Sequence, residues 1–162
     1  MTLLGFGAAV AECERAAEVL ADLGIEATVA NARFAKPLDE ELILQLARTT
    51  GGIITAEENV RAGGFGEAVL GLLADHHLAD TLLANLTMPD AIVDHGPQKT
   101  FRSRYRLDGP GIAERVQELL PQAADRHHAT RRRRLPRAPE QRRSWTPPSL
   151  QRRPSSNTRH AL

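Results

Sequence analysis

The sequence has little of what covalent cross-links and membrane spans require. Cys13 is the single cysteine among 162 residues, so an intrachain disulfide is excluded and neither a cysteine metal site nor a CxxC redox pair is indicated. No apolar run reaches the roughly 18 to 20 residues that span a bilayer. The first residues also lack the basic stretch and apolar core of a signal peptide. We therefore expect a soluble, cytoplasmic protein that does not bind membranes.

Positive charge is scarce in the first part of the chain and concentrated in the rest. Residues 1–120 carry 10 Lys/Arg and 18 Asp/Glu, a net charge of −8, whereas residues 121–162 carry 11 Arg and two acids, a net charge of +9. The hydrophobic content of 41% is enough for one folded domain, which we assign to residues 1–120. We expect residues 121–162 to be a disordered Arg/Pro-rich tail, because so few aliphatic side chains cannot offset the entropy of ordering.

The tail has two interpretations. The run Arg131-Arg132-Arg133-Arg134 and the later Arg pairs would bind a polyanion such as RNA or DNA through counterion release, largely without sequence preference. Alternatively, Arg, Pro, Ser, Ala and His in irregular order are what GC-rich DNA yields when it is translated out of frame.

Apolar periodicity predicts strands that alternate with helices in the first 120 residues. Short apolar runs predict strands at residues 2–6, 25–31, 53–56 and 81–86, and a short fifth strand at 91–93. Apolar residues at helical spacing predict helices between the strands and a final helix after Gly111. Such alternation is typical of βαβ units. The predicted fold class is α/β, a three-layer domain with a mostly parallel, roughly five-stranded sheet.

Glycine turns and paired acids are the first candidates for chemistry, and each has a structural alternative. Gly5-Phe6-Gly7 lies between a strand and a helix, but it lacks the third glycine of a dinucleotide fingerprint. Gly63-Gly64-x-Gly66 at a helix start could offer free amides to an anion, although we favour close backbone packing. Glu57 and Glu58 are adjacent on a strand, so their side chains point to opposite faces. We expect a cap or an interface contact there rather than an acid/base pair.

Single nucleophiles and imidazoles give weaker signals. His95 is a lone imidazole before Gly96 with no cysteine near it in the sequence, and Cys13 lies on the apolar face of its helix. We expect Cys13 to be a small core residue rather than a nucleophile.

The order and spacing of several motifs resemble one family. Its motifs stand here as Arg33-Phe34, Lys36-Pro37-Leu38-Asp39, Glu57-Glu58-Asn59, Gly63-Gly64-x-Gly66 and Pro89-Asp90. Together with Gly5-Phe6-Gly7 before them and His95-Gly96 after them, they resemble the C-terminal domain of 1-deoxy-D-xylulose-5-phosphate synthase, a transketolase-like enzyme. The resemblance covers residues 3–119 and leaves the tail unmatched. Each motif alone is weak, and their common order makes the resemblance specific.

The resemblance implies a reaction whose machinery lies in other domains. The full-length synthase is a dimeric transferase that condenses pyruvate with glyceraldehyde 3-phosphate and releases CO2, on the pathway to isoprenoids and thiamine. Its thiamine diphosphate and magnesium are held by a Gly-Asp-Gly…Asn motif and a glutamate of two earlier domains. This chain contains no Gly-Asp-Gly, so the resemblance assigns it no catalytic, cofactor-binding or metal-binding residue. We expect this chain alone to bind no cofactor.

The motif residues are therefore expected to form scaffold and interface. By resemblance, residues 33–39 and 57–66, with Pro89 and Asp90, contact other domains or chains of a transketolase-like enzyme in a homo- or hetero-oligomer. The chain departs from the family at Arg102, Arg104 and Arg106, where the family has a more acidic, helix-forming stretch. We expect the last contacts of the domain to differ there.

Three functions are open at this point. The first is a detached or truncated C-terminal domain of the synthase, a fragment that serves as a scaffold and dimer interface and is inactive alone. The second is a binding module whose Arg-rich tail engages nucleic acid. The third is a subunit of a split transketolase-type enzyme.

Overall fold

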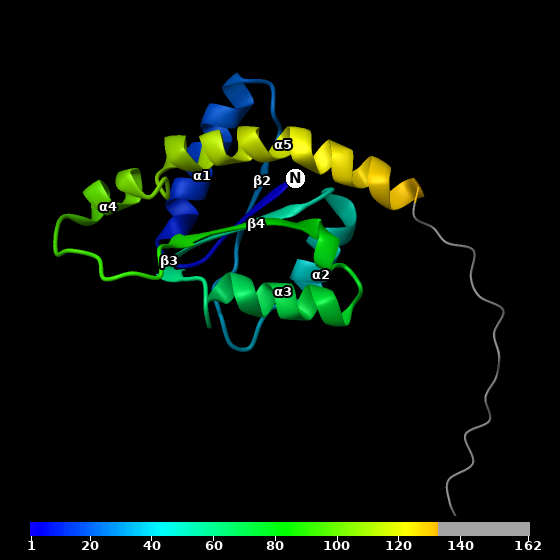
Figure 1. The fold of residues 1–162 in the computed structure, drawn as a ribbon, viewed down its shortest axis with the longest axis horizontal. Helices are drawn as coiled ribbons and strands as arrows, with labels where there is room; N and C mark the ends of the chain where they lie inside the picture. The colour runs from blue at the N-terminus through cyan, green and yellow to red at the C-terminus, as the bar shows by residue number, and fades with distance from the viewer. Residues whose placement is uncertain (133–162) are drawn as a thin grey trace, which may run out of the picture.

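The computed structural model describes the backbone of residues 1–132 and the side chains of residues 1–120 (Figure 1). Strands and helices alternate through most of this part of the chain. In order, they are β1 (Thr2–Gly5), α1 (Ala9–Asp22), β2 (Thr28–Asn31), α2 (Glu40–Thr49), β3 (Ile53–Val60), α3 (Phe65–Asp75), the 3-10 turn η1 (Ala79–Thr81), β4 (Leu82–Met88), α4 (Gln98–Arg104) and α5 (Gly109–Arg132). No helix among these is both long and apolar enough to cross a membrane.

A parallel sheet forms the middle layer. Its strand order is β2-β1-β3-β4, and each neighbouring pair is parallel. The central strand β3 is buried over its first five residues, Ile53 to Glu57, as expected for a parallel strand covered on both faces. The predicted α/β class with a mostly parallel sheet is confirmed.

Helices cover both faces of the sheet and build one core on each. Consecutive residues of a strand point to opposite faces, so Leu3 joins the core beneath α1 and α5 while Leu4 joins the core beneath α2 and α3. In Figure 1, α5 crosses one side of the sheet, and α2 and α3 lie on the other. The three-layer prediction is confirmed.

The predicted fifth strand does not form. Residues 91–93 follow β4 as an irregular segment, and the side chain of Ile92 is fully exposed at 101%. The chain turns away from the sheet after Pro89, which has no amide hydrogen for a ladder. It then makes a loop that leads to α4. The described sheet has four strands.

Two boundaries also differ from the prediction. Strand β3 continues to Val60, beyond the predicted end at residue 56, so Asn59 lies within it as well as Glu57 and Glu58. Helix α5 continues past residue 120, where we placed the end of the folded domain, and its backbone runs to Arg132. The rest of the predicted tail, residues 133–162, lies outside the described residues.

Candidate functional site

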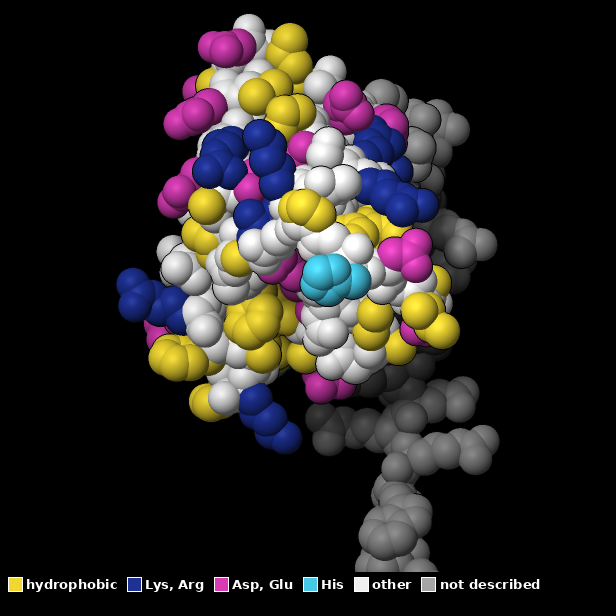
Figure 2. Space-filling view, turned by 90° about the vertical axis from the view of Figure 1, so that its left-hand side faces the viewer, with side chains coloured by type: hydrophobic (Ala, Val, Ile, Leu, Met, Phe, Trp, Pro, Cys, Tyr) yellow, Lys and Arg dark blue, Asp and Glu magenta, His cyan; other side chains and the backbone are white. Residues whose placement is uncertain are grey.

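The residues that the sequence singled out gather at one end of the sheet. Because the four described strands are parallel, their carboxyl ends share one edge. Residues 33–39 follow β2, residues 57–66 close β3 and open α3, and residues 89–97 follow β4. We call these three segments the carboxyl-end face. Figure 2 looks onto it and shows Lys and Arg side chains beside apolar ones. Open α/β sheets bind ligands at this end.

The loop after β2 presents its side chains outward. Arg33 has a φ of 57°, which non-glycine residues seldom adopt, and its amide donates a 2.9 Å hydrogen bond to Asn31 Oδ1. The side chain of Phe34 is 65% exposed, and Arg33, Lys36 and Pro37 are exposed as well. In the described domain, these four side chains therefore face solvent.

The end of this loop ties it to the next helix. Leu38 packs against the core beneath α2 and α3. Asp39 Oδ1 accepts a 3.1 Å hydrogen bond from the Leu42 amide, so this side chain caps α2.

Glu57 and Glu58 point to opposite faces, as predicted from the strand. Glu57 is fully buried, and its two carboxylate oxygens accept hydrogen bonds from the Phe65 and Gly66 amides, each 2.8 Å long. The carboxylate therefore occupies the place at the start of α3 where an external anion would bind. Glu58 turns outward with a side chain that is 30% exposed.

The glycine turn serves close packing around Glu57. A Cβ added at Gly64 would meet the Val60 carbonyl oxygen and lie 2.8 Å from Glu57 Oε2, and one added at Gly66 would overlap the Asn85 side chain. Gly63 has a φ of 71° and supplies the turn. The packing interpretation is confirmed for this turn.

The remaining motif residues make few contacts of their own. Asn59 Oδ1 accepts a 3.0 Å hydrogen bond from the Val60 amide. The Pro89 carbonyl accepts one from the Ala91 amide, and Asp90 is exposed. These residues shape the ends of β3 and β4 and bring no reactive group into the site.

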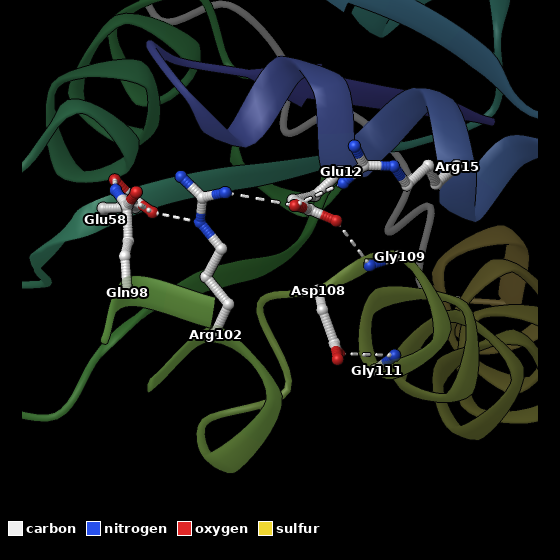
Figure 3. A network of polar contacts seen from close by, with 8 residues as sticks. All are labelled: Glu12, Arg15, Glu58, Gln98, Arg102, Asp108, Gly109 and Gly111. Carbon is white, nitrogen blue, oxygen red and sulfur yellow. Dashed lines mark hydrogen bonds and ion pairs between the residues drawn. The ribbon is translucent and has the colours of Figure 1, made fainter. Parts of the chain in front are cut away.

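A polar network that we did not predict links four elements, α1, β3, α4 and α5 (Figure 3). The guanidinium of Arg102, on α4, bonds Glu58 through Nε and lies 3.2 Å from Glu12 Oε1 on α1. Glu12 also lies 2.6 Å from Arg15 and accepts a 3.0 Å hydrogen bond from the Gly109 amide at the start of α5. Arg102 thus ties α4 to the carboxyl-end face and to the layer of α1 and α5.

A second set of contacts completes the network. Gln98 donates to both oxygens of Glu58, at 2.8 and 3.1 Å, and Asp108 Oδ1 accepts a 3.1 Å hydrogen bond from the Gly111 amide. Arg106 pairs with Glu114 and Glu118. Two of the three arginines that depart from the family pattern therefore hold the last elements of the domain in place.

The network changes the acidity of its members. Burial works to raise the pKa of Glu12, but the hydrogen bonds from Arg15 and Gly109 and the charge of Arg102 outweigh it and lower that pKa. Next to it, burial raises the pKa of Cys13 to about 12, which keeps the thiol protonated. Cys13 is 0% exposed, so its prediction as a core residue is confirmed.

The sequence contained a signal for Glu12 that we did not use. Glu12 falls on the same helical stripe as Ala9, Cys13, Ala16 and Leu20, all of them buried. An acid on a buried stripe needs a partner, and Arg102 is too far along the chain for spacing alone to reveal it.

A cavity with a volume of about 530 Å³ borders the network. It is lined by Glu12, Arg15, Lys99, Arg102, Asp108 and Pro110. Its two acids, Glu12 and Asp108, already accept hydrogen bonds from within the domain. The contacts of Glu12 hold α1, α4 and α5 together.

The comparisons with known proteins agree with this geometry. The sequence model of the transketolase C-terminal domain matches residues 1–112. The chain belongs to the transketolase C-terminal domain family. This transketolase C-terminal domain is 48% identical over 120 residues to 1-deoxy-D-xylulose-5-phosphate synthase 1 of Geobacter sulfurreducens, covering 74% of the chain and 19% of that enzyme. It is 40% identical over 129 residues to the synthase of Dehalococcoides mccartyi, covering 79% and 20%.

The chain spans about a fifth of the length of the curated relatives it matches. Among solved structures, it is similar to a chain described as a split gene transketolase in an inactive beta4 tetramer, with a TM-score of 0.63 and 29% identity. That match covers 74% of this chain and 39% of the other. The resemblance inferred from the motifs is confirmed.

The residues of this transketolase C-terminal domain do not fit the family's cofactor. The amides at the start of α3, which could face a diphosphate, are taken by Glu57. Within residues 1–120, no three His, Cys, Asp or Glu side chains come together as a metal site would need.

Proposed function

We propose that this chain serves as the C-terminal domain of a 1-deoxy-D-xylulose-5-phosphate synthase and acts as scaffold and interface. The synthase reaction would then need thiamine diphosphate-binding domains that these 162 residues do not supply, within a cytoplasmic assembly. The observation that carries the proposal is the 48% identity over 120 residues to a synthase, of which the matched part makes up 19%. The packing role of Glu57 supports it, because the strongest anion-binding feature of the domain is used internally.

In this proposal the motif residues act through contacts rather than chemistry. Asp39, Glu57 and the glycines build the carboxyl-end face, and the exposed side chains of Arg33, Phe34 and Lys36 offer contacts to other domains. The similar split gene transketolase supports a related possibility, a subunit that completes an enzyme encoded by two genes.

Calorimetry and a decarboxylation assay test the proposal. The purified chain, given thiamine diphosphate, magnesium, pyruvate and glyceraldehyde 3-phosphate, should bind no cofactor and release no CO2 above the protein-free rate. Added to the part of the Geobacter sulfurreducens synthase that it does not cover, it should raise the rate of CO2 release. Turnover by the chain alone would refute the proposal.

A second candidate function rests on the charge distribution. The net charge of +9 in residues 121–162, against −8 in the rest of the chain, favours a module whose tail binds a polyanion such as RNA. Both functions can coexist, because the carboxyl-end face and the tail use different residues.

A further inference from the structure

The cavity beside the polar network is lined by three cations from two helices. Arg15 belongs to α1, and Lys99 and Arg102 belong to α4. The volume of about 530 Å³ falls within the roughly 300 to 1,000 Å³ of pockets that bind small molecules. None of the residues assigned above to scaffold and interface lines this cavity. Its role is therefore a separate question from the synthase function.

The two acids of the cavity already have partners within the domain. Glu12 has a side chain that is 6% exposed, and its Oε1 lies 2.6 Å from Arg15 and 3.2 Å from Arg102. A backbone amide donates to its other oxygen. Asp108 turns away from the guanidinium groups and accepts a hydrogen bond from the Gly111 amide (Figure 3). Neither carboxylate depends on a group from inside the cavity.

The cations, by contrast, keep donors that the described residues do not use. Arg102 bonds through Nε and Nη1, and its Nη2 has no hydrogen-bond acceptor within residues 1–120. Arg15 bonds through Nη1 alone. The exposed Lys99 forms no ion pair within residues 1–120. Because guanidinium and ammonium groups only donate hydrogen bonds, the cavity holds an excess of donors, as an anion requires.

The two arginines are held in position by the fold itself. Both contact the same oxygen of the buried Glu12, so their guanidinium groups lie close together despite their like charge (Figure 3). Arg102 also bonds Glu58, and its side chain is 18% exposed. This hydrogen bond is the main reason that the pKa of Arg102 is raised, which keeps it charged. Groups that are already ordered lose little entropy when a ligand binds.

We propose that this cavity binds a small organic phosphate ester, with the phosphate group against Arg15, Lys99 and Arg102. An arginine fork bonds two phosphate oxygens at once, and a lysine ammonium adds a point charge at a third. A carboxylate would satisfy one arginine and leave the other cations unused. The cavity is far larger than one phosphate ion, so the organic part fits beside Pro110.

The binding should be weak for inorganic phosphate alone. Glu12 and Asp108 line the same cavity and repel an anion, which offsets part of the attraction. We expect a dissociation constant on the order of 1 mM. The affinity should fall with salt, because Arg15 and Lys99 are exposed.

The lysines supply a site-specific probe for the full chain. The sequence contains two, Lys36 and Lys99, so a protein labelled with carbon-13 at lysine Cε gives two signals, and the variant Lys99→Arg assigns them. Lys36 lies in the exposed loop after β2, outside the cavity, and serves as the internal control. The 11 arginines of residues 121–162 do not appear in this spectrum, since that segment has no lysine.

Titrations compare four probes at constant pH and at a constant ionic strength of about 0.15 M. Inorganic phosphate and glucose 6-phosphate should each shift the Lys99 signal along a saturating curve, with tighter binding of the ester. The Lys36 signal should move little and without saturation. Glucose and acetate should leave the Lys99 signal nearly unchanged.

A matched pair of arginine variants tests the contribution of α1. Arg15→Gln should weaken phosphate binding at Lys99 by roughly threefold or more. Arg48→Gln removes an exposed cation from the last turn of α2 and should bind phosphate like the parent. Thermal unfolding checks that both variants keep the fold.

Three results would overturn the proposal. They are equal movement of the two lysine signals, an unchanged affinity in Arg15→Gln, and acetate binding as tight as that of phosphate. The lysine comparison uses the unsubstituted protein, so it decides the matter even if Arg15→Gln fails to fold. These titrations contain neither thiamine diphosphate nor pyruvate, so failure of the phosphate site and failure of the synthase role are distinguishable.

Discussion

Position 64 favours glycine because a Cβ there would meet the Val60 carbonyl oxygen. The residue has φ −77° and ψ 173°, which alanine adopts freely, so any cost of Gly64→Ala comes from contact with the Val60 carbonyl and Glu57. We expect the free energy of unfolding to fall by roughly 1–3 kcal/mol, as measured by urea denaturation. Gly71→Ala is the control, because nothing lies within 4 Å of the added methyl, and it should stabilise α3 by about 0.5–1 kcal/mol. Equal effects of the two would show that Gly64 is not packed as described.

Glu12 should make stability depend on pH in the acid range. Its folded pKa lies below the ordinary value of 4.5, so its ionised form stabilises the fold above about pH 4.5, and this contribution is lost as the pH falls through the lowered pKa. Glu12→Gln should therefore flatten the curve of unfolding free energy against pH below 4.5, relative to the parent. Glu14→Gln, at an exposed acid of the same helix, should leave the curve unchanged. A parent curve that Glu12→Gln does not alter would contradict this role.

At the scale of elements, two polar side chains of α4, Gln98 and Arg102, tie it to the rest of the domain. No residue of α4 is buried, and Arg102 bridges Glu58 and Glu12. Arg102→Gln should release α4 without unfolding the sheet, so hydrogen exchange should become faster in residues 98–105 and stay unchanged in β1 and β3. Arg104→Gln, which removes an exposed cation of the same helix, serves as the control. Uniformly faster exchange in the sheet would show that the network supports the whole fold instead.

The same elements show what sequence patterns can and cannot predict. Strands β1 and β3 could be predicted from the sequence because a buried parallel strand appears as a short apolar run. The opposite directions of Glu57 and Glu58 followed from the local geometry of a strand. The pairing of Arg102 with Glu12 joins residues that are 90 positions apart, and no local period encodes it. Residues 91–93 had the composition of a strand, but nothing in their own sequence reports that the chain leaves the sheet after Pro89.

At the scale of the whole molecule, an acidic domain carries a strongly basic extension. Residues 133–162 contain eight Arg and one acid. The acidic domain repels a polyanion, but this repulsion should not prevent the basic residues from binding it. We expect the full chain to bind single-stranded RNA without sequence preference, with log K falling against log salt at a slope on the order of −3 to −6. Fluorescence anisotropy with a labelled oligonucleotide at several salt concentrations measures this slope. Deleting residues 133–162 should abolish RNA binding and leave the thermal unfolding of the domain unchanged. If the shortened chain bound RNA as tightly as the full chain, the binding would belong to the domain, and the proposed role of the tail would be wrong.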